Sequence, residues 1–305
     1  MLHLRYRAVI NALKGAVLSA LQRTIRAVLR LVPARLVVLI KANAIVVRPM
    51  DYQKGQILLC LDSDLEYKVR LNSCRKEPDT VAWIERFFEP GDVFFDIGAN
   101  VGAYSLVASQ VHGRCIRVYA FEPSAINFAQ LVRNIALNRF QDIILPVPIA
   151  LSDCTKIQVL SYHDMVPGGA LHCVHDSGDS RNAGLTPIFC QSVLTFRLDD
   201  IIDQFTFPTP AHIKIDVDGN EPRVLAGAAR TIQNSVLRSV LVEVDELRLP
   251  ETQWVSAFLA ERGLHLHSKY TFETGPNMRL CNCIFSRKRP ESPPTIEQHR
   301  TSTGS

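Results

Sequence analysis

Residues 92–105, DVFFDIGANVGAYS, constrain the fold of this chain more than any other segment. An apolar run ends in Asp96, and a turn that contains Gly98 and Gly102 then leads into a helical pattern. Glycine lets the backbone turn sharply and approach a ligand closely. A strand, a glycine turn and a helix in this order are typical of an open α/β sheet, in which ligands bind beyond the carboxyl ends of the strands.

Strands and helices alternate along the rest of the chain. We expect strands at 93–97, 116–121, 143–150, 212–216 and 239–244, and helices at 100–111, 126–137 and 222–232. A helix at about 251–262 precedes two short strands, 264–271 and 280–286, which are close enough to form a hairpin. The pattern predicts an α/β fold with a mostly parallel, doubly wound sheet and a C-terminal antiparallel hairpin strand.

Three further regions complete the expected organisation. Before the glycine turn, two strands at 57–61 and 66–71 and a helix beginning at Pro78 are expected. Residues 151–198 hold glycines and histidines with little helical period, which indicates an irregular insertion with short strands. Residues 287–305 are rich in Pro, Ser and Thr, and we expect them to be disordered. The main domain therefore spans 51–286.

The charge of the chain is concentrated at one end. Residues 1–50 hold nine Lys or Arg and no Asp or Glu, and the formal net charge of the chain is +4, so the remainder carries −5. A mildly acidic body argues against a broad nucleic-acid-binding face. The eight cysteines include no C-x-x-C pair, which argues against a zinc ribbon and is typical of thiols packed in a reducing cytosol.

The first 50 residues contain a basic amphipathic helix. One side carries Ile10, Leu13, Val17, Leu21, Ile25, Val28 and Val32, and the opposite side carries Arg5, Ser19, Arg23, Arg26 and Arg30. The charges are spread along the segment, unlike those of a signal peptide, and no uncharged stretch approaches the length of a bilayer crossing. The helix either packs on the domain or lies on an anionic membrane surface or a partner through residues 1–35. Residues 36–47 could be strand or continuing helix. The expected location is cytoplasmic, with the inner membrane surface as the peripheral alternative.

The charge next to the glycine turn discriminates between two classes of cofactor. A dinucleotide site needs G-x-G-x-x-G to hold a pyrophosphate, and the spacing here is G-A-N-V-G. Asp96 would repel a pyrophosphate but suits a ligand with a positive amino group. S-adenosylmethionine (SAM) carries an ammonium and a sulfonium and no phosphate, so the turn favours SAM over NAD. Glu122 ends the next strand, about 20 residues past the turn. An acid at this position can accept hydrogen bonds from both hydroxyls of a ligand's ribose.

Two further acids end neighbouring strands and are the candidate catalytic residues. Asp216 ends the strand at 212–216 and could hold the methionine end of SAM, orient the acceptor or take its proton. Glu243 lies at the end of the strand at 239–244 and is the second candidate base. For Lys214 we favour a structural ion pair. His172 and His175, in the insertion, are weaker alternatives for the base. The acids at these strand ends could also hold a divalent cation, but solvated strand ends explain them equally well, and we assign no metal ligand.

The chain resembles the FkbM family of SAM-dependent methyltransferases. The matching runs include FFDIGANVGAYS, AFEPSAINFAQLVRNIALN, ALSD at 150–153, FRLDD at 196–200, IKIDVDGNEPRVLAGA and LVEV at 241–244. The resemblance implies a Rossmann-like class I methyltransferase fold that usually acts on a hydroxyl of a sugar, glycolipid or polyketide-like product. It also implies which residues lie around the cofactor: Asp96, Gly98, Ala99, Asn100 and Gly102 at the turn, Glu122 at the ribose, and Ser152 or Asp153 near the adenine. The family more often has Glu where Asp218 stands.

Two other functions remain open on the sequence. One is a nicotinamide-dependent oxidoreductase on the same kind of sheet, which the absent phosphate loop disfavours. The other is a non-catalytic scaffold that binds SAM but has lost its acceptor site. The expected partner in the favoured case is a small molecule or glycan with a free hydroxyl, and no nucleic acid is expected.

Overall fold

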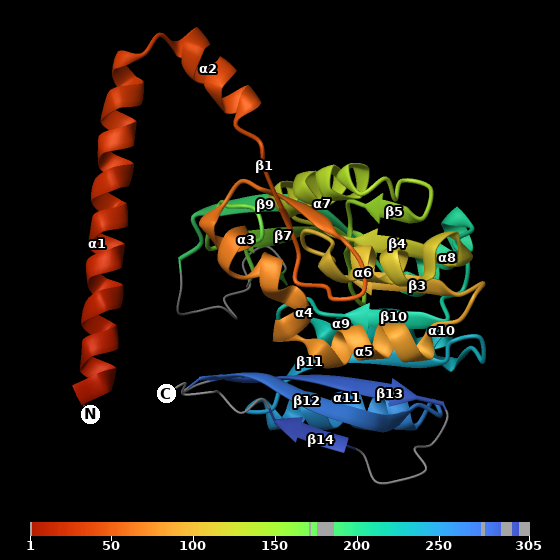
Figure 1. Cartoon of the computed structure of the whole chain (residues 1–305). Coiled ribbons are helices and arrows are strands. Elements are labelled where there is room, and N and C mark those ends of the chain that lie inside the picture. Colours follow the sequence, from red (N-terminus) through yellow and green to blue (C-terminus); the bar gives the residue numbers. More distant parts are fainter. Residues whose placement is uncertain (1, 171, 176–185, 276–277, 288–294, 299–305) are drawn as a thin grey trace. The chain divides into compact units, whose positions relative to one another are not determined.

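The computed structural model describes residues 2–170, 172–175, 186–275, 278–287 and 295–298. It consists of two compact units, Met1–Val46 and Val47–Ser305, which are shown in Figure 1. The first unit contains helices α1 (Leu2–Leu31) and α2 (Ala34–Asn43). The ambiguous segment 36–47 is thus helical as far as Asn43, and strand β1 (Val46–Pro49) follows it. In the part of the chain that the structure describes, no helix is both long enough and apolar enough to cross a membrane.

The second unit is built on a sheet with the strand order β14-β12-β13-β11-β10-β3-β4-β5. Its strands are β3 (Val93–Ile97), β4 (Arg117–Phe121), β5 (Ile144–Val147), β10 (His212–Ile215), β11 (Ser239–Asp245), β12 (His265–Gly275), β13 (Met278–Ser286) and β14 (Thr295–Gln298). The five strands from β11 to β5 are parallel, and β13 runs antiparallel to both β11 and β12. The predicted parallel α/β sheet with a C-terminal antiparallel hairpin is confirmed.

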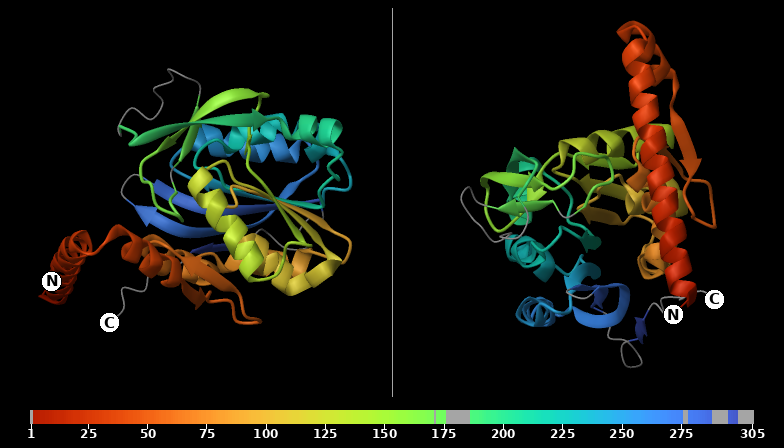
Figure 2. Two further views of the ribbon diagram at one scale, coloured as in Figure 1. Left: turned by 90° about the horizontal axis from the view of Figure 1, so that it is seen from above. Right: turned by 90° about the vertical axis from the view of Figure 1, so that its left-hand side faces the viewer.

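Helices cover both faces of this sheet (Figure 2). One face packs against α5 (Pro78–Phe87), α6 (Ala103–His112) and α7 (Ala125–Leu137), and the other against α8 (Leu198–Phe205), α9 (Glu221–Gly227), α10 (Ala229–Gln233) and α11 (Leu249–Ala260). Short 3-10 turns lie at Arg70–Asn72 (η1) and Gly113–Cys115 (η2).

The strands alternate between two hydrophobic cores, as pleated strands that are buried on both sides must. In β3, Phe94 belongs to the core with α5, α6 and α7, whereas Phe95 and Ile97 belong to the core with α8 to α11. In β10, Ile213 and Ile215 join the second core. The alternating positions on these strands, which include Asp96 and Lys214, therefore face the first side of the sheet, where the carboxyl ends of the strands carry polar groups.

The segment expected to be a strand at 66–71 is helical instead. Ser63 caps the N-terminus of helix α3 (Asp64–Lys68). The Ser63 side chain accepts a hydrogen bond from the Glu66 backbone N–H at 3.0 Å, and the Glu66 carboxylate accepts one from the Ser63 backbone N–H at 2.9 Å. This capping box satisfies the first turn and fixes the helix, which overrides the alternating apolar pattern. Helix α4 (Ser73–Lys76) follows. The strand expected at 57–61 is present as β2 (Leu58–Leu61).

The insertion forms a separate small sheet. Its strands are β6 (Ala150–Leu151), β7 (Lys156–Tyr162), β8 (Cys173–His175) and β9 (Phe189–Phe196), in the order β6-β9-β7-β8. The predicted strand at 143–150 is divided, because β5 ends at Val147 and β6 pairs with β9. Of the tail expected to be disordered, Thr295–Gln298 pair with β12 as strand β14, and residues 288–294 and 299–305 lie outside the described part of the chain.

Candidate functional site

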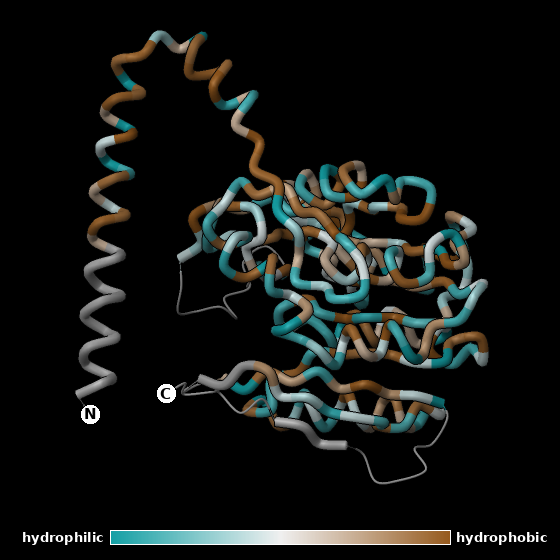
Figure 3. Tube along the Cα trace, viewed as in Figure 1, coloured by the Kyte–Doolittle hydropathy of each residue, from teal (hydrophilic) through white to brown (hydrophobic). Residues whose placement is uncertain are grey.

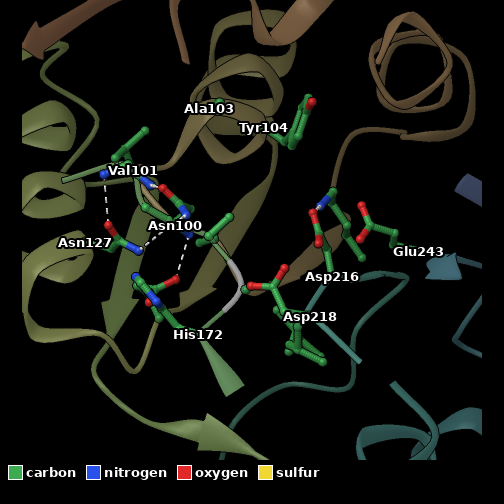
Figure 4. Close-up of a pocket in the computed structure, with 18 of the residues that line it drawn as sticks. Asn100, Val101, Ala103, Tyr104, Asn127, His172, Asp216, Asp218 and Glu243 are labelled. Carbon is green, nitrogen blue, oxygen red and sulfur yellow. Dashed lines mark hydrogen bonds and ion pairs between the residues drawn. The ribbon is translucent and has the colours of Figure 1, made fainter. Parts of the chain in front are cut away.

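A cavity of about 570 Å³ opens at the carboxyl ends of the parallel strands. Its wall includes residues of the glycine turn, of the loops after β4 and β10, of β11 and of the insertion; Figure 4 shows part of this wall. The volume lies within the range of small-molecule sites. The strand order brings to this cavity seven of the ten site residues that the sequence predicted, and leaves Asp96, Gly102 and Asp153 outside its wall.

The glycine turn is fixed by close backbone contact. Gly98 has φ +83°, and a Cβ atom there would lie 1.8 Å from the backbone oxygen of Asp216. Gly102 has φ +91°, and a Cβ atom there would lie 2.5 Å from Leu131 Cδ1. Both positions therefore exclude a side chain, and the close approach of the turn to Asp216 joins β3 to β10 at the cavity. Gly98, Ala99 and Asn100 line the cavity, whereas Gly102 lies behind it at the start of α6.

Glu122 lies in the cavity wall as the sequence predicted. Its carboxylate accepts one hydrogen bond from the Asn100 N–H and one from the Ser124 N–H, each at 2.8 Å. The side chain is buried, and this burial raises the pKa of Glu122 to about 7, although the two backbone hydrogen bonds oppose the shift. Each carboxylate oxygen still has a lone pair for a further donor, such as a ribose hydroxyl.

Asp96 does not line the cavity. It lies beneath the glycine turn, where its Oδ2 accepts a hydrogen bond from the Ser105 hydroxyl at 2.6 Å. Its Oδ1 is buried and has no hydrogen-bond partner in the described residues. Burial raises the pKa of Asp96, and the positive charge of Lys214 opposes this shift. Asp96 therefore joins β3 to the first turns of α6 through Ser105 and has no direct contact with the cavity.

Ser152 and Asp153 have different environments. Ser152 lines the cavity, whereas Asp153 does not. The Asp153 carboxylate accepts from Arg223 Nε at 3.0 Å and from Arg223 Nη2 at 2.8 Å. Of the two residues that the resemblance placed near the adenine, the structure brings only Ser152 to the cavity.

The two candidate catalytic acids lie at the ends of neighbouring strands. Lys214 pairs in register with Leu241, so Asp216 and Glu243, each two residues further along, lie beside each other on the same face of the sheet. Both line the cavity (Figure 4). Tyr104, which the sequence analysis did not single out, lies in the same part of the wall, and its ring is 5.0 Å from Lys214 Nζ.

Lys214 makes the two acids electrostatically different. Its ammonium, 1% exposed, donates to Asp216 Oδ2 at 2.6 Å, which confirms the ion pair expected for it. Burial alone would raise the pKa of Asp216, but Lys214 outweighs burial and lowers it. The pKa of Glu243 is raised well above its usual range by burial and by the negative charge of Asp216. Glu243 thus holds its proton more tightly than Asp216 does.

Glu243 is buried but makes no hydrogen bond to any residue that the structure describes. It is 8% exposed and lies in the cavity wall. A ligand in the cavity can therefore hydrogen-bond to the Glu243 carboxyl group. No three His, Cys, Asp or Glu side chains in the described part of the chain are grouped so that they could hold a metal ion.

Residues 96–274 match the sequence profile of the methyltransferase FkbM domain. The chain belongs to the FkbM methyltransferase family. S-adenosylmethionine is therefore its cofactor. Five acids and four basic side chains line the cavity, and two of the acids, Glu122 and Asp216, flank the glycine turn, which suits a donor with an ammonium and a sulfonium.

Individual relatives are only distantly similar. The hexuronic acid methyltransferase AglP of Haloferax volcanii is 25% identical over 57% of this chain, and the chain covers 65% of that protein, slightly under two thirds. The 31-O-demethyl-FK506 methyltransferase FkbM of Streptomyces tacrolimicus is 29% identical over 52% of this chain and 67% of its own. A crystal structure of the methyltransferase FkbM from Methylobacillus flagellatus is 19% identical, with a TM-score of 0.41 over 65% of this chain and 44% of that chain.

Proposed function

We propose that this protein is an O-methyltransferase that transfers the methyl group of SAM to a hydroxyl of a sugar, glycolipid or polyketide-like small molecule. The observation that carries the proposal is Glu243, a buried carboxyl without a hydrogen-bond partner among the described residues, in the same cavity as the glycine turn and Glu122. The names of the two relatives support it, since one is a hexuronic acid methyltransferase and the other a 31-O-demethyl-FK506 methyltransferase.

The predicted cofactor residues form two groups, one in the cavity wall and one behind it. Gly98, Ala99, Asn100, Glu122 and Ser152 all line the cavity. The backbone of the glycine turn would border the donor, Glu122 would accept hydrogen bonds from the ribose hydroxyls, and Ser152 would lie toward the base. Asp96 and Gly102 support the turn from behind. When bound, SAM supplies a methyl carbon that its sulfonium has already activated, so the protein mainly has to align the acceptor oxygen with it.

The two strand-end acids then have separate tasks in methyl transfer. The ion pair with Lys214 favours the ionised form of Asp216 and makes it a weak base. Asp216 therefore orients the acceptor by accepting a hydrogen bond from the acceptor hydroxyl. Glu243 has the higher proton affinity and no competing partner among the described residues, so in its ionised form it accepts the proton of the acceptor hydroxyl. A positive charge close to Glu243 favours that ionised form.

The test is methyl transfer from labelled SAM to fractions of a cell extract, with identification of the product. The variant Glu243→Gln should lower transfer by about 100-fold or more while it leaves binding of S-adenosylhomocysteine (SAH) unchanged. Glu246→Gln is the matched control, because Glu246 pairs with Lys269 and does not line the cavity. Binding of SAM without transfer to any fraction would favour a non-catalytic scaffold, and binding of NADH in place of SAM would favour an oxidoreductase.

We further propose that the N-terminal unit binds an anionic membrane surface. In the described part of α1, apolar side chains on one face are about half exposed or more: Val17, Leu21, Ile25, Val28 and Leu31. Arginines occupy the opposite face, and hydrophobic and hydrophilic stretches alternate along the helix (Figure 3). A basic face without any acid beside an apolar face fits the interface of an anionic bilayer.

Sedimentation of the full-length protein with vesicles tests this proposal. We expect binding to phosphatidylglycerol-containing vesicles, weaker binding to phosphatidylcholine alone, and loss of binding in the charge-reversed variant Arg23→Glu/Arg26→Glu/Arg30→Glu or after deletion of residues 1–35. Equal sedimentation of the wild type and the charge-reversed variant with anionic vesicles, or no binding by the wild type, would refute it.

A further inference from the structure

The cavity continues past Glu122 into a slot with mainly apolar walls. The slot is the part of the cavity wall lined by Pro123, Ile149, Leu151 and Leu160, and the polar Ser152 follows Leu151 in the lining. If Glu122 holds the ribose and the reacting methyl group lies toward Glu243, this slot is left for the base of the nucleoside. A purine has apolar faces and a polar edge, so such a slot needs at least one polar group to read that edge.

The insertion closes this slot. Between β7 and β8, the backbone at Pro167, Gly168 and Gly169 crosses from the small sheet to the glycine turn. Gly168 and Gly169 both line the cavity. A Cβ atom at Gly168 would lie 2.9 Å from Glu66 Cγ, and one at Gly169 would lie 2.3 Å from Asp164 Oδ1, so the chain passes only because neither residue has a side chain.

Four side chains from four different elements bind this crossing. Ser63 donates to the Pro167 oxygen at 2.7 Å, Arg70 Nη2 donates to the Gly168 oxygen at 2.6 Å, and Asn100 Nδ2 donates to the Gly169 oxygen at 2.7 Å. The fourth is that of Asn127, which accepts from the Gly168 N–H at 2.9 Å and donates to the Gly169 oxygen at 3.1 Å. The Asn100 and Asn127 contacts are visible in Figure 4. The insertion is thus fastened to the glycine turn itself and to elements on both sides of it.

This attachment places His172 in the wall of the slot. His172 lines the cavity, and its ring lies 4.7 Å from the ring of Tyr162, centroid to centroid, which limits its movement. Its Nδ1 is buried and has no hydrogen-bond partner in the described residues. Burial lowers the pKa of His172, so the ring is neutral and has one donor and one acceptor nitrogen. Asp153, the other polar candidate for the base, is outside the cavity and paired with Arg223.

We propose that His172 is a cofactor-binding residue that hydrogen-bonds the edge of the adenine ring, and that the insertion exists in part to carry it there. The inference rests on the proposed use of the cavity for SAM. The role is positioning of the nucleoside, because His172 lies apart from Asp216 and Glu243 in the cavity wall (Figure 4).

Calorimetric titration of the full-length protein with SAH tests the assignment. His172→Ala should bind SAH about threefold to tenfold more weakly than the wild type, the effect of one lost hydrogen bond, and His172→Gln should recover part of the loss. His175→Ala is the matched control: His175 hydrogen-bonds Ser161 at 2.7 Å, does not line the cavity, and should leave SAH binding unchanged. The KM for SAM of His172→Ala should rise by a similar factor, and that of His175→Ala should not change.

Nuclear magnetic resonance provides a direct readout on the intact wild type. The imidazole ¹⁵N signals of His172, assigned by their absence in His172→Gln, should shift in step with SAH saturation, and those of His175 should not. A wild type that binds SAH without moving the His172 signals, or a folded His172→Ala that binds SAH as tightly, would overturn this inference and leave the proposed function intact. A wild type that binds neither SAM nor SAH would instead refute the proposed function.

Discussion

Glu122→Gln is the substitution whose effects on stability and binding can be worked out most fully from the structure. The two carboxylate oxygens accept separate hydrogen bonds from the backbone N–H groups of Asn100 and Ser124. Glutamine offers one oxygen and one NH₂ group, so one buried N–H loses its acceptor, at a cost of about 1–3 kcal/mol in the free energy of unfolding.

The pH dependence of the wild-type free energy of unfolding offsets part of this cost at high pH. Burial raises the pKa of Glu122 from 4.5 to about 7. A group with a raised pKa in the folded state contributes stability that is fully present below pH 4.5 and is lost as pH rises through 7. The loss is on the order of 3 kcal/mol, and the glutamine variant does not suffer it. The variant should therefore be less stable than the wild type at pH 5 and approach it at pH 8, as urea unfolding monitored by circular dichroism would measure.

Cofactor binding should respond more strongly than stability. Ribose hydroxyls donate best to the ionised carboxylate, so wild-type affinity for SAH should rise by up to about tenfold per pH unit below 7 and level off above it. Glu122→Gln removes a hydrogen bond to a charged group, worth about 1.5–3 kcal/mol, which corresponds to an affinity about 10- to 150-fold weaker at pH 8. Its affinity should also be nearly independent of pH.

Calorimetry with SAH at pH 6, 7 and 8 is the assay, and Asp153→Asn is the control. Asp153 is paired with Arg223 outside the cavity, so its substitution should leave the SAH affinity and its pH dependence unchanged. Glu122 would be excluded as the ribose ligand if Glu122→Gln bound SAH like the wild type at all three pH values.

Two further substitutions test the framework of the site. Gly98→Ala would place a Cβ atom 1.8 Å from the Asp216 backbone oxygen, so it should abolish SAM binding and lower the melting temperature. Gly91 has a similar φ of +94° and nothing within 4 Å of a Cβ atom, so Gly91→Ala should lower the free energy of unfolding only by about 1 kcal/mol. Equal effects of the two substitutions would refute the steric argument. Lys214→Met would leave the buried Asp96 and the partly buried Asp216 without their counter-charge. It should lower the free energy of unfolding at pH 7 by about 3–5 kcal/mol, with a smaller loss at pH 5. A loss independent of pH in urea titrations would contradict the charge-pairing account.

The sequence was sufficient for the central sheet because its strands are buried on both faces. The runs that became β3, β4 and β10 are short, apolar and separated by helical periods, which leaves few alternatives. The positions of Asp216 and Glu243 followed from the same pattern, since parallel strands end at one edge of the sheet. Their different proton affinities did not, because these depend on where the Lys214 ammonium lies in three dimensions.

The misplaced strand at 66–71 had a detectable signal. Ser63 and Glu66 have the spacing of a capping box, which predicts a helix start more specifically than a short alternation of apolar residues predicts a strand. The residues of the insertion had no comparable signal. Gly168 and Gly169 could be recognised as a turn. Their hydrogen bonds to Asn100 and Asn127, however, join segments 69 and 42 residues apart, which no local pattern encodes.

The assignment of Asp153 to the adenine shows the same limit. The family resemblance implied a cofactor contact for it, yet its carboxylate pairs with Arg223, on a helix 70 residues later, and does not line the cavity. A side chain at a strand end is only a candidate until its partners in the fold are known.

The most direct test of the account is whether the folded wild-type protein binds a cationic nucleoside donor in this cavity. Calorimetry with SAM and with NADH, on protein whose folding has been verified by circular dichroism, measures this in two titrations. We predict one SAM bound per chain, competition by SAH and no heat with NADH. Tight binding of NADH with no heat from SAM or SAH would contradict the account.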